Sequence, residues 1–271
     1  MCWHFDPSDG FRDAAVRFLS EGDRHNERLM YVADGESAAA LYAQLDELGE
    51  VDRRVADGSL TAVPLRELCQ LGAGFDGAEQ VARYRELAEA AERDGFGGLR
   101  VAADVTSIVI DENARRPFLD YELAVDALMA ELSLSALCAY DASVLGPAGA
   151  QLSVVHPQRH VPPCDDPGFS LFRDGDGIFR LAGEVDVRCR ELFSVALETA
   201  ASAAQDEVVL DLGDLGFVDV AGLTRLWRWA DELSAQGRTV RLERVPGIVQ
   251  RCCTHLGFES LLGVASGVTV P

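Results

Sequence analysis

The stretch that decides the fold of the second half of the chain runs Val208-Val209-Leu210-Asp211-Leu212-Gly213-Asp214-Leu215-Gly216-Phe217-Val218-Asp219-Val220-Ala221-Gly222-Leu223. Its first part is apolar and rich in β-branched residues, stops at Asp211, and is followed by a glycine-containing turn. The apolar run resumes at Phe217, and from Asp219 onward apolar residues recur at helical spacing. The stretch therefore predicts a buried strand, a turn, and a helix that begins at Asp219.

The segments around this stretch predict a small sheet with helices packed on one side of it. Two apolar runs, 169–172 and 178–183, flank the hairpin signal Asp174-Gly175-Asp176-Gly177. A helix is expected from Cys189 to Ala203, and the central helix is expected to continue to about Gln236. A strand at 239–243 and a helix at about 247–256 complete this half.

The centre of the second half resembles the STAS domain, the fold of anti-sigma-factor antagonists, over about residues 169–266. The family signature is an apolar strand that ends in Asp-Ser-Ser/Thr-Gly before a helix, and here the segment reads Asp219-Val220-Ala221-Gly222. Gly183-Glu184-Val185-Asp186 similarly matches the approach to the first STAS helix. Asp219 and Gly222 match the signature, while Ala221 stands where the family carries its phosphorylatable hydroxyl. The resemblance implies the fold without the usual phosphorylation switch.

The resemblance also implies that the helix start and the helix after it bind a kinase-type anti-sigma factor or a related regulatory protein. The residues expected to touch that partner are Asp219, Val220, Ala221, Gly222, Leu223 and Trp229. Asp219 has a second role open to it, as an ordinary helix N-cap. The helical period places Trp229 off the apolar face of the helix. Its ring is therefore expected either to bind the partner or to pack over the edge of a domain in the same chain.

The first half predicts an α/β domain with a mostly parallel sheet, because expected strands alternate with expected helices. The strands are expected at 28–33, 59–65, 99–110, 135–141 and 152–157, and the helices at 9–20, 38–48, 78–93 and 117–132. The first of these strand-loop-helix units is like the one that opens a RecA-type fold. Its loop, Asp34-Gly35-Glu36-Ser37, has one glycine, no lysine and two carboxylates, so we expect no phosphate-binding loop.

The first half resembles the MEDS sensory domain, a RecA-like module without a working phosphate loop. The features that carry the resemblance are His4, Glu21-Gly22, Asn26-Glu27-Arg28, Tyr121-Glu122, Leu137-Cys138-Ala139-Tyr140-Asp141 and His156-Pro157, in that order. The resemblance implies that this half senses a small, apolar molecule or receives a signal without performing chemistry.

His4, Cys138 and His156 could converge to bind a metal or a ligand, because strand ends of an open α/β sheet line a crevice. Four further residues could add polar contacts there: Tyr121, Glu122, Tyr140 and Asp141. The alternative is that Cys138 is a small core residue and that His156 merely closes a strand. Both interpretations stay open at this point.

The chain is expected to divide into a sensory domain at residues 1–160, a Pro-rich linker at 161–168 and a STAS domain at 169–271. Prolines at 157, 162, 163 and 167 favour extended backbone over helix in that linker.

The composition limits the partners and the chemistry. The net charge of −21 disfavours binding of nucleic acid and of anionic membrane surfaces. All basic residues are Arg, which excludes every mechanism that needs a Lys. Seven cysteines without a C-x-x-C pair, and no long apolar run, predict a cytoplasmic protein without disulfides, metal or cofactor.

We therefore expect a non-enzymatic two-domain signalling regulator, whose second domain binds a regulatory protein under control of the first. No hydrolase or dinucleotide motif is present. Cys252 and His255 share a helix face and could form a Cys-His couple, and the alternative is that these thiols are simply buried. Two alternatives remain: a degenerate nucleotide-binding protein with weak ATPase activity, and a scaffold subunit that assembles with other STAS proteins. Assembly of the chain with itself is left open.

Overall fold

The computed structural model describes residues 1–5, 10–35, 37–68, 75–156, 159–160, 166–174 and 176–262. Contacts divide the chain into two compact units, Met1–Ser153 with Gln158–Asp165, and Val154–Pro157 with Asp166–Pro271. Each unit is described by itself. Residues 161–165 of the expected linker lie outside the described residues.

The first unit is built on a six-stranded sheet in which all pairings are parallel, in the order β3-β2-β4-β5-β1-β6. Its strands are β1 (Cys2–Phe5), β2 (Arg28–Ala33), β3 (Leu60–Pro64), β4 (Leu99–Asp104), β5 (Leu134–Asp141) and β6 (Arg159–His160). Its longer helices are α1 (Phe11–Arg24), α5 (Gly77–Arg93) and α7 (Glu112–Glu131). The shorter ones are α2 (Ala38–Tyr42), η1 (Ala43–Leu48), α3 (Val51–Ala56), α4 (Leu65–Leu68), α6 (Thr106–Val109), α8 (Ala142–Leu145), η2 (Gly146–Ala148) and α9 (Gly149–Ser153).

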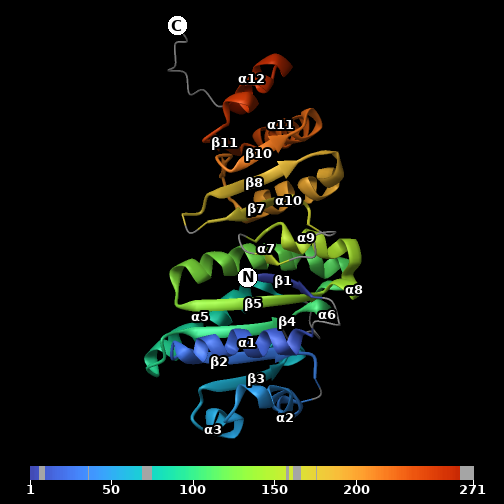
Figure 1. Cartoon of the computed structure of the whole chain (residues 1–271). Coiled ribbons are helices and arrows are strands. Elements are labelled where there is room, and N and C mark those ends of the chain that lie inside the picture. The colour runs from blue at the N-terminus through green and yellow to red at the C-terminus, as the bar shows by residue number, and fades with distance from the viewer. Residues whose placement is uncertain are drawn as a thin grey trace. The chain divides into compact units, whose positions relative to one another are not determined.

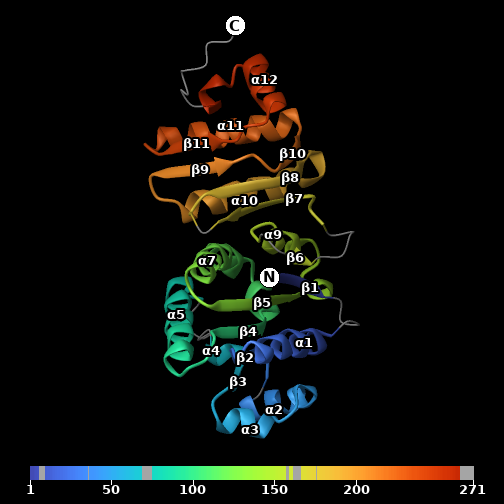
Figure 2. The same cartoon turned by 60° about the vertical axis from the view of Figure 1, so that its left-hand side comes forward.

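Helices cover both faces of this sheet, which confirms the predicted α/β class. Figures 1 and 2 together show α1 and α2 on one face, with α5 and α7 on the other. The alternation of each strand divides the core accordingly, because successive side chains point to opposite faces. Phe5, Leu29 and Tyr31 join Phe11 and Leu19 of α1 in one apolar cluster.

The second unit has a five-stranded sheet and confirms the predicted second domain of sheet and helices. Its strands are β7 (Phe169–Arg173), β8 (Phe179–Val185), β9 (Glu207–Asp211), β10 (Leu215–Val218) and β11 (Thr239–Glu243), in the order β10-β8-β9-β11 with β7 antiparallel to β8. Its helices are η3 (Val187–Cys189), α10 (Arg190–Ala203), α11 (Val220–Ala235), α12 (Gly247–Leu256) and η4 (Glu259–Leu262). Helix α10 packs against β7 and β8 and also against α11.

Three expectations about elements of the first unit are wrong, and one strand was missed. The strand expected at 99–110 ends at Asp104, because Asp104 Oδ1 accepts hydrogen bonds from the backbone N–H and hydroxyl of Thr106 and starts α6. The strand expected at 152–157 is not formed, since Leu152 and Ser153 belong to α9. Helix α7 starts before Pro117, after the N-cap Asp111, and β1 was not expected at all.

Candidate functional site

The start of α11 is a tightly packed helix N-terminus. The Asp219 side chain accepts a hydrogen bond from the Gly222 backbone N–H at 2.6 Å, so the predicted N-cap is formed, a contribution of about 1 kcal/mol. A Cβ at Gly222 would lie 2.9 Å from Val218 Cγ2 and 3.0 Å from Val185 Cγ1. The absence of a side chain at Gly222 therefore lets α11 approach the ends of β8 and β10 closely.

Three large apolar side chains are exposed around this helix start. Val220 is 58% exposed, Phe217 50% and Val187 64%. They lie at one edge of the sheet, because β8 and β10 are parallel neighbours with Val185 opposite Val218, and each strand ends there. We call Val187, Phe217 and Val220 the apolar edge surface.

Two of these three residues were missed in the sequence. Phe217 sits inside an apolar run that reads as a buried strand, but β10 is a short edge strand and has a register irregularity between Leu215 and Phe217. Val187 follows Asp186, whose side chain caps η3. An apolar residue directly after a capping Asp, as at Val187 and at Val220, is the signal that could have found this surface.

Ala221 stands at this helix start in place of a residue with a hydroxyl. Ala221 is half-buried in the first turn of α11 and offers no oxygen for phosphorylation. The nearest hydroxyl along the helix, Thr224 Oγ1, donates a hydrogen bond to the Val220 carbonyl oxygen at 2.7 Å.

Three residues expected to touch a partner are buried instead, among them Gly222. Trp229 is 3% exposed and Leu223 is fully covered, so both belong to the inward face of α11 with Leu226 and Leu233. The prediction that Trp229 lies off that face is wrong. A helix with Trp at both 227 and 229 can turn either ring inward, and the structure buries Trp229.

Trp227 takes the partly exposed position instead. Its ring stacks on Phe258 with centroids 4.9 Å apart, and its Nε1–H donates to Ser260 Oγ at 3.3 Å. Trp227 therefore holds the segment that contains Phe258 and Ser260 against α11.

An ionic cluster joins the ends of β9 and β11 near the start of β8. The buried Asp211 carboxylate accepts hydrogen bonds from Arg244 at 2.6–2.8 Å, from Arg180 at 3.1 Å and from the Gly213 backbone N–H at 2.8 Å. Burial raises the pKa of Asp211, but these bonds and the charges of Arg244 and Arg180 outweigh it and hold the pKa below its usual value. The charged Asp211 side chain thus links the ends of β9 and β11 to the start of β8.

In the first unit, the structure brings together three of the residues expected to bind a ligand. His4 lies beside Tyr140 on neighbouring strands, with ring centroids 5.3 Å apart. The Tyr140 hydroxyl donates to Glu122 Oε1 at 3.1 Å, and all three side chains are buried. Burial and the Glu122 carboxylate raise the pKa of Tyr140 well above its ordinary value.

Cys138 lies on the same face of the sheet, where burial favours its neutral thiol. It is buried opposite Cys2 on β1, and burial first, then the Glu122 charge, raise its pKa well above the ordinary value. A neutral thiol is a poor nucleophile and a poor metal ligand. Within the described ranges, no group of three or more His, Cys, Asp and Glu side chains is placed to hold a metal ion.

The remaining predicted ligand residues make other contacts. Tyr121 packs on Phe75 and Phe118. Asp141 caps α8 by accepting from the backbone N–H groups of Ser143 and Val144. His156 is buried and belongs to the second unit by its contacts.

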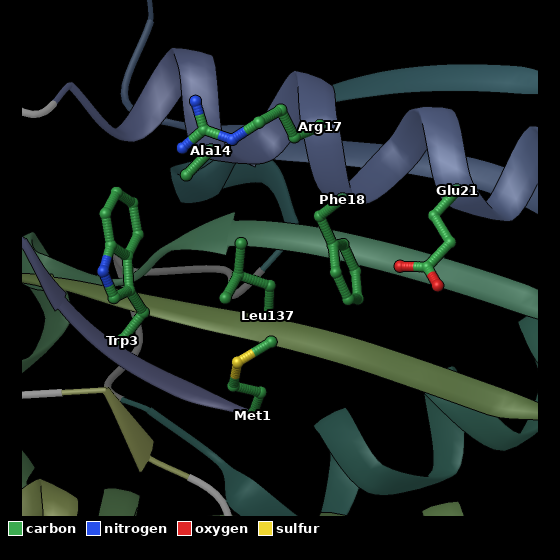
Figure 3. Close-up of a pocket in the computed structure, with 7 residues that line it drawn as sticks. All are labelled: Met1, Trp3, Ala14, Arg17, Phe18, Glu21 and Leu137. Atoms are coloured by element: carbon green, nitrogen blue, oxygen red, sulfur yellow. The ribbon is translucent and has the colours of Figure 1, made fainter.

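A cavity of about 640 Å³ opens on the opposite face of the first sheet, between α1 and strands β1 and β5. Its lining consists of Met1, Trp3, Ala14, Arg17, Phe18, Glu21 and Leu137. Figure 3 shows the Trp3 and Phe18 rings on either side of Leu137, with Arg17 reaching over from α1. None of the predicted ligand residues lines this cavity.

The comparison with protein families supplies the decisive observation for the first unit. Residues 1–157, more than half of the chain, match the family described as MEDS, the methanogen/methylotroph, DcmR sensory domain. The chain belongs to the MEDS family. Residues 172–263 match the family described as Mlab, STAS domain, so the MEDS domain is followed by a STAS domain. The comparison with curated proteins found no match.

The predicted fusion of a MEDS and a STAS domain is therefore confirmed. A sensory domain joined to a domain of a protein-binding family indicates a regulatory role. Along the described part of the chain, no helix has both the length and the apolar character needed to cross a membrane.

Proposed function

We propose that this MEDS–STAS protein is a non-enzymatic signalling regulator whose STAS domain binds a kinase-type anti-sigma factor or a related regulatory protein. In this proposal the MEDS domain controls the binding, and no phosphate is transferred to the start of α11. The proposal extends the regulatory role indicated by the two domains to a kind of partner and a mode of control.

The single observation that carries the proposal is the apolar edge surface. Val187, Phe217 and Val220 are each at least half exposed, whereas the apolar residues beside them, Val185 and Leu223, are buried. Exposed apolar side chains beside packed strand ends are typical of a protein-binding site, because covering them removes apolar area from water. Gly222 packs closely against Val218 and Val185, and this packing fixes the position of Val220 in that surface.

The absence of a hydroxyl at Ala221 supports control without phosphorylation at the usual position. Ala221 has no hydroxyl, and Thr224 Oγ1 is engaged with the Val220 carbonyl oxygen. A change in partner affinity must then come from another input, and the MEDS domain is the part of the chain whose family is described as sensory.

The test is copurification of the tagged full chain with the kinase-type anti-sigma factors of the same genome. Val220→Arg places a charge on the apolar edge surface, and because Val220 is exposed the fold should tolerate it. We expect the wild-type chain to retain one such factor and Val220→Arg to lose it.

The matched control is Ile110→Arg, which changes a residue of the first domain that is 53% exposed. This variant should retain the factor as the wild type does. Failure of the wild-type chain to retain any anti-sigma factor, or equal retention by Val220→Arg, would overturn the proposal.

A further inference from the structure

We propose that the cavity between α1 and strands β1 and β5 is the ligand site of the MEDS domain, and that it takes a small aromatic carboxylate. The inference rests on the sensory role given to this domain in the proposed function and deepens it by naming a site and a ligand class. It also moves the site away from the predicted His4, Tyr140 and Glu122 cluster, which lies on the other face of the sheet.

The walls of the cavity suit a flat apolar body. Trp3 and Phe18 present their rings on either side, and the Leu137 side chain lies between them (Figure 3). Phe18 is held in place, because the Arg100 guanidinium lies 4.6 Å from its ring centroid and Arg100 Nη1 donates to the Phe18 carbonyl oxygen at 3.5 Å. An aromatic ring bound over Leu137 would contact both aromatic side chains and gain burial.

The charges at the cavity favour an anion. Arg17 lines it and makes no hydrogen bond or ion pair with any residue that the structure describes. The other charged side chain of the lining, Glu21, lies 3.7 Å from Arg100 Nη1, and Arg100 also pairs with Glu27. Met1, which lines the cavity as well, carries the N-terminal ammonium. The lining therefore holds two cations against the Glu21 carboxylate, and the planar fork of the Arg17 guanidinium matches a carboxylate.

The size of the cavity points to a small molecule and not to a protein segment. A volume of about 640 Å³ lies within the range of ligand pockets, roughly 300–1,000 Å³. A bound helix would need a groove along several turns, whereas this cavity is lined on α1 by residues spanning Ala14 to Glu21 only.

The test uses three probes that share one ring system and differ in charge: 2-naphthoate, 2-naphthylmethanol and 2-naphthylmethylamine. Binding of each to the purified full chain is measured by isothermal titration calorimetry. We expect 2-naphthoate to bind at one site with a Kd below about 1 mM, and the neutral and cationic probes to bind at least about fivefold more weakly. No saturable binding of 2-naphthoate, or tighter binding of the amine, overturns the proposal.

Two variants locate the bound probe. Arg17→Gln removes the charge at an exposed position and should weaken 2-naphthoate binding at least about tenfold, while binding of the alcohol changes less than about threefold. Arg24→Gln removes a charge from an exposed position of the same helix outside the cavity and should change neither. Equal affinity of wild type and Arg17→Gln for 2-naphthoate contradicts the assignment.

Ala14→Trp should fill the cavity and abolish binding of all three probes. Its fold is checked by circular dichroism, and Arg17→Gln keeps the proposal testable if that variant does not fold. These titrations contain no protein partner, so the ligand site can fail while Val220-dependent partner binding persists. If the probes bind as expected but no partner binds, only the proposed function is contradicted.

Discussion

Gly222 shows how one missing side chain positions the candidate docking surface. Adding a methyl group there brings it to 2.9 Å from Val218 Cγ2 and 3.0 Å from Val185 Cγ1, so α11 must shift away from the strand ends. We expect Gly222→Ala to destabilise the STAS domain by about 1–3 kcal/mol, measured by urea unfolding. A gain in stability would mean that the helix start is not packed as described.

Gly216→Ala is the matched control for this substitution. A Cβ at Gly216 would have ordinary contacts, 3.5 Å from the Gly183 carbonyl oxygen and 4.0 Å from Glu184 Cγ. The change in the free energy of unfolding should therefore stay within about 0.5 kcal/mol.

Asp211 makes the stability of the STAS domain depend on pH. Its pKa is lower in the folded protein than in the unfolded chain, so the carboxylate stabilises the fold above the unfolded pKa, about 3.9. This stabilisation is lost as the pH falls through the lower, folded pKa. Asp211→Asn should destabilise the domain at pH 7 by about 1–3 kcal/mol and flatten the acid limb of its stability profile.

Urea unfolding of wild type and Asp211→Asn between about pH 3 and pH 7 measures this effect. The comparison variant is Asp231→Asn, an exposed carboxylate on α11. An unchanged acid limb in Asp211→Asn would show that the Arg180 and Arg244 contacts do not stabilise the folded carboxylate.

At the scale of elements, the phase of helix α11 separates two tryptophans with different roles. Trp229 is in the core, so Trp229→Ala should cost about 3–5 kcal/mol of unfolding free energy. Trp227 is partly exposed and stacks on Phe258, so Trp227→Ala should cost about 1–2 kcal/mol. Urea unfolding of both variants tests which tryptophan faces the core. A larger loss of unfolding free energy in Trp227→Ala than in Trp229→Ala would contradict the burial of Trp229.

Helix α11 also shows what the sequence could predict. The start of the helix was predictable because a capping Asp, a close-packed Gly and an apolar period agree at Asp219. The period alone could not place Trp229, since 3.6 residues per turn leaves residues at the margin of the apolar stripe ambiguous. Only the packing of α11 against the sheet and α10 resolves that ambiguity.

The first domain was less predictable where contacts distant in sequence decide the structure. Strand β1 is four residues long and too short to show a period, yet it pairs with β5 more than 130 residues away, where Cys2 lies opposite Cys138. The position of β1 separates His4 from Trp3 on opposite faces of the sheet. His4 is a candidate in the sequence because its side chain can bind a ligand or a metal. A cavity lined by Trp3 and Phe18 leaves no such sign, because it forms only when β1 pairs with β5 beside α1.

At the scale of the whole molecule, the chain joins a domain of a sensory family to a domain whose usual hydroxyl is replaced by Ala221. If the MEDS domain supplies the input, the two domains must share a coupling free energy. Such couplings are typically about 1–3 kcal/mol, which is about 5- to 150-fold in affinity. This coupling is the central claim of the proposed function.

The most direct measurement is the Kd of one anti-sigma factor for the full chain and for a chain that begins at Val154, both obtained by calorimetry. The shorter chain keeps the hydrogen bond from the Leu171 N–H to the Val154 carbonyl oxygen and all of the STAS domain, and its fold is checked by circular dichroism. We predict that the two Kd values differ at least about fivefold. Equal Kd values would show that the MEDS domain does not control partner binding and would contradict the account.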